Sequence, residues 1–118
     1  MIFGLRPHDI ISAMTNRELH IARILKDKIS RVTPLLDFKV FGSRARGDAD
    51  EYSDLDIFVE VPILNGGLEE KIQHVAWEVG LDQMMFISVV VLSKFEMEDS
   101  PLRASPFVQN IREEGIRI

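Results

Sequence analysis

The sequence predicts an α/β fold of the α+β kind, a small mixed β-sheet with helices packed mainly on one face. Apolar runs with strand composition occupy residues 38–41, 54–61 and 85–92, and helix-like segments lie before and after them. At 118 residues, the chain is long enough for one hydrophobic core. We therefore expect a single domain over residues 1–118, without a second, substrate-binding domain.

The helices are delimited by signals at their ends. Residues 7–14 are compatible with a short first helix, and the TNRE sequence at 15–18 is typical of a capping box that opens a second. A third helix is expected over residues 68–79, ending at Gly80. Ser105 and Pro106 predict the start of the last helix, which Gly115 ends before a short edge strand at 116–118.

The run MFISVVVL at 85–92 is the most apolar strand, and we expect it to be central in the sheet. Trp77 is expected to pack beside the apolar stripe of the preceding helix, in preference to stacking on a base. Met84 and Met85 are expected to fill the core or to contact a partner.

Composition excludes several classes of function. The chain has no cysteine, which removes disulfides, thiolate catalysis and cysteine zinc sites. A net charge of −5 makes nucleic acid an unlikely partner, because phosphate neutralisation needs clustered Lys and Arg. Neither a membrane span nor a secretory signal is evident, so we expect a cytoplasmic protein that does not bind membranes.

The sequence GSRARGDADEYSDLD at residues 42–56 is the most informative segment. Gly42 follows a short strand and allows a sharp turn, which presents the Ser43 hydroxyl at once. Backbone N–H groups beside a small hydroxyl suit an anion, and Arg44 and Arg46 add cations within reach of a phosphate. The turn is therefore predicted to bind phosphate.

Asp54 and Asp56 lie at alternate positions of the next strand, so their side chains share one face. The roughly 3.3 Å rise per residue separates them by about 7 Å along the strand, close enough to converge on one cation. Carboxylate oxygens favour Mg²⁺ or Mn²⁺ over zinc. Beside a phosphate-binding turn, such a metal site indicates a nucleoside triphosphate.

Gly42-Ser43, ten residues, and Asp54-Leu55-Asp56 together resemble the signature of the polymerase-β-type nucleotidyltransferases, and the short chain resembles their minimal nucleotidyltransferase (MNT) branch. The resemblance implies the nucleotidyltransferase fold and Mg²⁺-dependent transfer of a nucleoside monophosphate, most simply AMP from ATP, to a hydroxyl. It also implies that Ser43 contacts the triphosphate and that Asp54 and Asp56 bind the metal.

One part of the family's pattern is missing. Catalytic members carry a third carboxylate on a neighbouring strand, and the segment 85–92 contains no acid. Ser88 is its only strongly polar residue, and we expect it to face the aspartate cleft together with Val90, while Ile87, Val89 and Val91 point the other way. Asp82 and Glu60 are weaker substitutes for the missing acid.

The sequence is compatible with two functions of different classes. The chain is either a nucleotidyltransferase acting on a hydroxyl of a partner protein or small molecule, or a catalytically weak, antitoxin-like module that pairs with a HEPN-type helical protein, as MNT members commonly do. A small-molecule antibiotic-modifying enzyme would need additional chain to hold its acceptor. The base, the acceptor and the oligomeric state, including a homo-oligomer, are left open.

Overall fold

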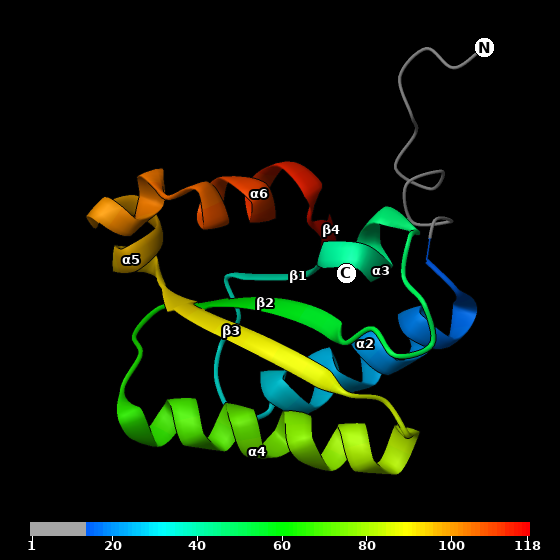
Figure 1. The fold of residues 1–118 in the computed structure, drawn as a ribbon. Coiled ribbons are helices and arrows are strands. Elements are labelled where there is room, and N and C mark those ends of the chain that lie inside the picture. Colours follow the sequence, from blue (N-terminus) through cyan, green and yellow to red (C-terminus); the bar gives the residue numbers. More distant parts are fainter. Residues whose placement is uncertain (1–13) are drawn as a thin grey trace, which may run out of the picture.

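Two long helices, α2 (Asn16–Ser30) and α4 (Gly66–Gln83), lie against one face of a four-stranded sheet (Figure 1). The structure is a computed structural model that describes residues 14–118. The predicted helix over residues 7–14 therefore lies outside the described residues, except for Met14 at its end. The capping box is confirmed: Glu18 N donates to Thr15 Oγ1 at 3.1 Å, and Thr15 N donates to Glu18 Oε1 at 2.7 Å.

The sheet consists of β1 (Asp37–Phe41), β2 (Leu55–Val61), β3 (Ile87–Ser93) and β4 (Ile116–Arg117), in the order β3-β2-β1-β4. β1 pairs antiparallel with β2 and with β4, whereas β2 and β3 are parallel. Parallel neighbours need a long crossover connection, and α4 supplies it. The small mixed sheet is thus the one that the sequence predicts.

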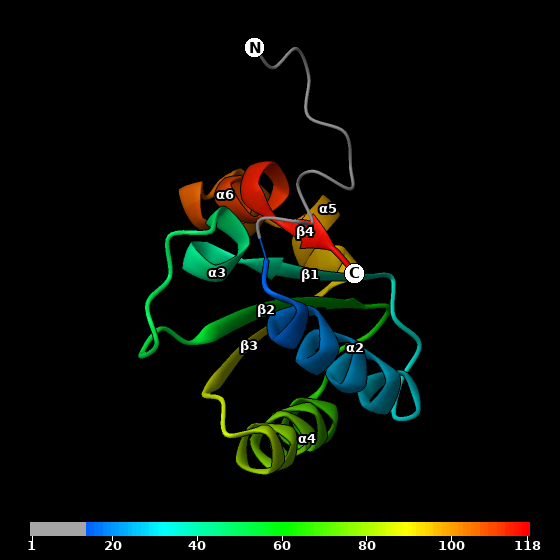
Figure 2. The ribbon, with the colours of Figure 1, turned by 90° about the vertical axis from the view of Figure 1, so that its right-hand side faces the viewer.

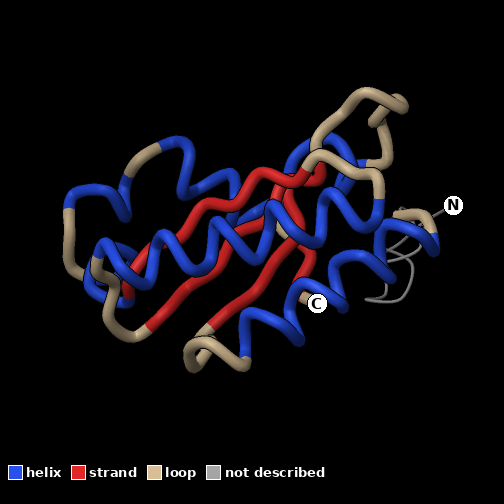
Figure 3. Tube along the Cα trace, turned by 90° about the horizontal axis from the view of Figure 1, so that it is seen from below, coloured by secondary structure: helices blue, strands red, loops and turns tan. Residues whose placement is uncertain are grey.

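Both faces of the sheet are partly covered, as Figures 2 and 3 show from two sides. The larger core, which includes Leu25, Ile57 and Ile72, lies between the sheet and the two long helices. On the other face, α5 (Lys94–Glu98), η1 (Pro101–Ala104) and α6 (Pro106–Glu114) form a smaller core around Phe58. The helix α3 (Gly42–Arg46) lies on this second side, at the end of β1.

The prediction that residues 85–92 form the central strand is wrong. β3 is an edge strand, and β2 and β1 are the inner pair. Its apolar character has another cause, because each of its faces has a core to contact. Val89 and Val91 pack in the larger core, and Leu92 packs in the smaller one. A strand covered on both faces is apolar throughout whether or not both its edges are paired.

The helix α4 does not end at Gly80 but continues to Gln83, where Met84 caps it in the left-handed conformation at φ 56°. The expectation for Trp77 is also wrong, since its side chain is 61% exposed. Met85 is buried as expected for a core residue, whereas Met84 and Phe86 are 85% and 81% exposed. In the described part of the chain, no helix is long and apolar enough to cross a membrane.

An apolar groove with a volume of about 300 Å³ follows from this arrangement. It runs between the last turns of α4 and the start of β3. We call it the α4–β3 groove, and its lining residues are Ala76, Trp77, Gly80, Leu81, Met84, Met85, Phe86 and Ile87.

Candidate active site

The turn after β1 brings the phosphate-binding segment against β2. Gly42 has a φ of +74°, a left-handed conformation that glycine adopts without the steric cost of a Cβ atom. A Cβ atom at this position would overlap the carboxylate of Asp56. The sequence therefore needs glycine here for two reasons, the backbone conformation and the close approach of an acidic side chain.

Asp56 lies at the centre of the candidate site. It pairs with Phe41 of β1 on one side and with Ser88 of β3 on the other. The side chain of Asp56 is half-buried, while that of Asp54 is exposed. Burial and then the nearby charge of Asp54 raise the pKa of the Asp56 carboxyl above its ordinary value, and Arg46 partly opposes this. The charge of Asp54 thus acts on Asp56, although Asp54 lies just before β2 and not within the strand as the sequence predicts.

Ser88 occupies the position that the sequence analysis assigns to it. Its register with Asp56 places both side chains on one face of the sheet, and Val90 shares that face while Val89 and Val91 lie in the opposite core. A hydroxyl therefore stands beside Asp56 where catalytic relatives are expected to carry an acid. Asp82 lies near the C-terminal end of α4, and Glu60 lies four residues further along β2.

The donor set fits a metal ion that arrives with its nucleotide. Across residues 14–118, no group of three or more His, Cys, Asp or Glu side chains is arranged to hold a metal by itself. Mg²⁺ is commonly held by one or two carboxylates together with substrate phosphates and water. Asp54 and Asp56 supply two hard oxygen donors of that kind, beside the Gly42–Ser43 turn.

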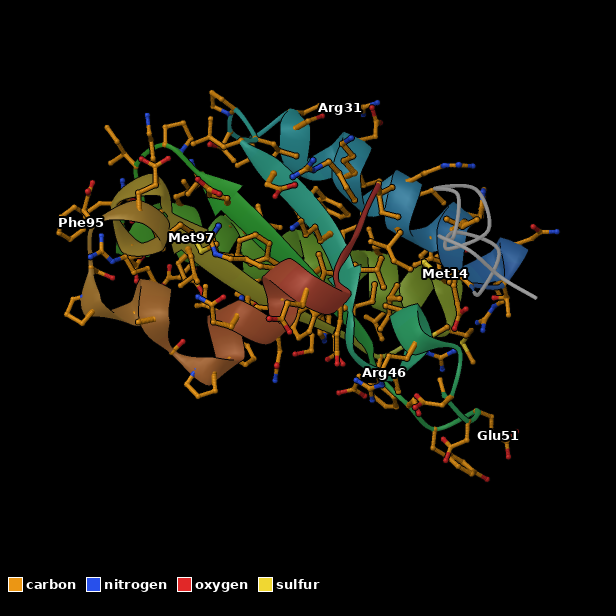
Figure 4. The ribbon with its side chains drawn as sticks, turned by 90° about the horizontal axis from the view of Figure 1, so that it is seen from above. Met14, Arg31, Arg46, Glu51, Phe95 and Met97 are labelled. Carbon is orange, nitrogen blue, oxygen red and sulfur yellow. The ribbon has the colours of Figure 1, made fainter. Side chains whose placement is uncertain are left out.

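Arg46 is placed to serve the same site. Its charge acts on Asp56, and its guanidinium makes exposed ion pairs with Asp48 at 3.3 Å and with Glu114 of α6 at 3.2 Å. Figure 4 shows Arg46 at the end of α3, with Glu51 further out on the loop that follows. Exposed ion pairs contribute little free energy, so a phosphate can replace them.

The prediction that Arg44 contacts phosphate is not supported, because its side chain is turned inward. The Arg44 residue is only 8% exposed, and its Nη1 donates to Glu18 Oε2 at 2.8 Å. Its Nε and Nη2 donate to the carbonyl oxygen of Ser53 at 3.0 and 2.7 Å. Neither Glu18 nor Ser53 is among the site residues that the sequence predicts.

The sequence does indicate that Glu18 needs a buried partner. This acid lies on the helical stripe shared with Ile21, Ala22, Leu25 and Ile29, all of which are buried. A carboxylate on an apolar face needs a partner, because burying an unpaired charge is costly. Burial alone would raise the pKa of Glu18, but hydrogen bonds from Arg44 and Thr15 outweigh it and lower that pKa below its ordinary value.

Comparisons with known proteins agree with this geometry. The model of the family described as "Nucleotidyltransferase domain" matches residues 20–118. A Methanocaldococcus jannaschii protein named "Putative protein adenylyltransferase" is 36% identical over 89 residues, which are 73% of this chain and 82% of that protein.

A solved structure supports the fold. The crystal structure of a "putative nucleotidyltransferase" from Sulfolobus solfataricus superimposes with a TM-score of 0.50 and covers 99% of this chain and 90% of that one, at 19% identity. Together with the family match, this confirms the resemblance seen in the Gly-Ser and Asp-x-Asp motif. The chain belongs to the nucleotidyltransferase domain family of the polymerase-β-type superfamily.

Proposed function

We propose that the protein is a Mg²⁺-dependent adenylyltransferase that transfers AMP from ATP to a hydroxyl group of another protein. The observation that carries this is the register between Phe41 and Asp56, which sets the Gly42–Ser43 turn beside the two carboxylates. The name of the Methanocaldococcus relative supports both the adenylyl group and the protein acceptor. Mn²⁺ has the same preference for oxygen ligands and is an alternative metal.

In this reaction the acceptor oxygen forms a bond to the α-phosphorus, the bond from that phosphorus to the bridging oxygen breaks, and pyrophosphate leaves. A bound Mg²⁺ would neutralise charge on the phosphates. Asp54 and Asp56 would hold it, Ser43 would donate a hydrogen bond to a phosphate oxygen, and Arg46 would exchange its surface ion pairs for phosphate. The proton of the acceptor hydroxyl would leave to solvent.

Labelled ATP tests the reaction type. With Mg²⁺ and acceptor proteins from a cell extract, we expect protein labelling from ATP labelled at the α-phosphate and none from ATP labelled at the γ-phosphate. Label from the γ-phosphate would indicate a kinase instead. Release of free AMP without labelled protein would indicate hydrolysis, and either result would contradict the proposal.

Ser43→Ala is expected to weaken ATP binding while leaving the fold intact. The Ser43 side chain is partly exposed and makes no hydrogen bond within residues 14–118, so its loss leaves no buried partner unpaired among them. A hydrogen bond to a charged group contributes about 1.5–3 kcal/mol, which corresponds to a tenfold or greater loss of affinity. Calorimetry with Mg²⁺-ATP measures the affinity, and thermal unfolding serves as the control.

Ser88→Asp is expected to increase transfer activity. The substitution places a carboxylate beside Asp56, where it can bind metal and accept the proton of the attacking hydroxyl. General-base catalysis contributes about 10² to 10⁴-fold, so a gain of tenfold or more is expected even from imperfect geometry. Val90→Asp, on the same face but two residues further along β3, is the matched control and should give no gain. Equal activity of Ser88→Asp and the unmodified protein would argue against this assignment.

The second candidate function is a binding module that pairs with a HEPN-type helical protein, and the α4–β3 groove favours it. Trp77, Leu81, Met84 and Phe86 expose a continuous apolar surface there. Such a surface is typical of a protein interaction site. Phe86 also precedes Ile87, the residue that pairs with Leu55, so the groove lies at the same end of the sheet as the candidate site, on the opposite face.

This pairing can be tested where the reading frame next to this one encodes a small helical protein. We expect the two proteins to co-purify, and we expect Leu81→Ser with Phe86→Ser to separate them. The control is Ile63→Ser with Phe95→Ser, which removes two exposed apolar side chains outside the groove. Retention of the complex by the groove variant would exclude the groove as its interface.

A further inference from the structure

Arg44 follows Ser43, the candidate phosphate contact, in the sequence, but its side chain points into the protein interior and not toward the turn. Its guanidinium is buried and donates to Glu18 Oε2, to the carbonyl oxygen of Ser53 and, at 3.3 Å from Nη2, to the carbonyl oxygen of Asp50. Arginine has donors arranged in a planar fork, which can reach a carboxylate and a carbonyl group at once. A single side chain thus connects α2, α3 and the loop over residues 47–54.

The carbonyl that Arg44 holds belongs to the residue directly before Asp54. On the other side of Asp54, Leu55 N donates to the carbonyl oxygen of Phe86 at 2.8 Å, and the Leu55 side chain is completely buried. The backbone of Asp54 is therefore held on both flanks, although its own side chain is exposed. An exposed carboxylate takes its position from its backbone, because no packed side chain restrains it.

The loop also has local restraints that are independent of Arg44. Tyr52 N donates to Asp50 Oδ1 at 2.8 Å, and Asp50 N donates to Ser53 Oγ at 3.1 Å. These bonds shape the turn over residues 50–53 but do not attach it to the rest of the domain. Arg44 provides that attachment, together with the Leu55–Phe86 hydrogen bond.

We propose that Arg44 is a positioning residue that holds the Ser53 carbonyl and thereby fixes the carboxylate of Asp54 beside Asp56 for metal binding. This inference rests on the proposed role of Asp54 as a metal ligand. Because the guanidinium is buried and directed away from the turn, Arg44 acts through the backbone and does not contact the nucleotide.

Two substitutions separate this role from a general contribution to stability. Arg44→Lys keeps a cation near Glu18 but removes the fork that reaches the Ser53 carbonyl. Glu18→Gln removes the charge partner and leaves the bonds from Arg44 to the loop in place. Both variants disturb the same buried ion pair, so both are expected to lower the thermal unfolding midpoint.

Binding of Mn²⁺ together with a non-hydrolysable ATP analogue is the decisive measurement, made by electron paramagnetic resonance well below the unfolding midpoint of each variant. We expect Arg44→Lys to weaken Mn²⁺ binding about tenfold or more, and Glu18→Gln to change it less than threefold. We also expect faster amide hydrogen exchange at residues 53–55 in Arg44→Lys alone. Unchanged Mn²⁺ affinity in Arg44→Lys, or equal losses in the two variants, would overturn the proposal.

Asp54→Asn is the reference variant, because it tests the metal role of Asp54 separately from the positioning role of Arg44. If Asp54→Asn weakens Mn²⁺ binding and Arg44→Lys does not, the positioning role is wrong and the metal site stands. If Asp54→Asn leaves Mn²⁺ affinity unchanged, the metal role of Asp54 fails, and the positioning role fails with it.

Discussion

Replacing both Asp54 and Asp56 by asparagine is expected to abolish the Mg²⁺-dependent part of ATP binding. Asparagine keeps the size of each side chain but removes the negative charge that a divalent cation needs. The raised pKa of Asp56 reflects burial and repulsion from Asp54, so the double variant should also relieve that repulsion and leave the fold at least as stable. Calorimetric titration with ATP, in Mg²⁺ and in chelator, measures the effect.

The matched control for this variant is Asp82→Asn with Asp99→Asn. Both of these aspartates are exposed, lie outside the candidate site and change the net charge by the same amount. The control should retain the difference in ATP affinity between Mg²⁺ and chelator. An undiminished difference in the Asp54 and Asp56 variant would show that the metal site lies elsewhere.

Gly42→Ala is expected to damage stability and the site together. The left-handed backbone conformation of Gly42 costs a residue with a Cβ atom roughly 1–2 kcal/mol, and the added methyl group would overlap the Asp56 carboxylate. Either the turn or Asp56 must move, so we expect a lower free energy of unfolding and weaker Mn²⁺ binding. Urea unfolding and a Mn²⁺ titration of the same preparation measure both.

Gly66→Ala is the control for this substitution. Gly66 is at the start of α4, and an added Cβ atom would meet no atom within 4 Å beyond its chain neighbours and the backbone of its own helix. Alanine also has the higher helix propensity, so this variant should be as stable as the unmodified protein or slightly more stable. If Gly42→Ala were equally stable, the turn would not need glycine and would not pack closely against Asp56.

Short-range features of this protein are readable from the sequence, because residues a few positions apart determine them. The capping box of Thr15 and Glu18 and the cap at Ser105 both form as predicted. The turn at Gly42 and the alternation of Ser88 and Val90 with Val89 and Val91 along β3 also follow from local rules, the freedom of glycine and the alternation of side chains along strands. The motif from Gly42 to Asp56 thus indicated the family.

Properties that depend on distant partners were decided only by the tertiary structure. The sequence could not show that Arg44 turns inward, since its partner Glu18 is 26 residues away and the carbonyl of Ser53 belongs to a loop. Nor could hydrophobicity place β3 at the edge of the sheet. An apolar strand indicates that both of its faces are covered, but it does not indicate how many of its edges are paired with other strands. The sequence by itself determined which groups are available for phosphate and metal, whereas the long-range contacts decided which of them face the site.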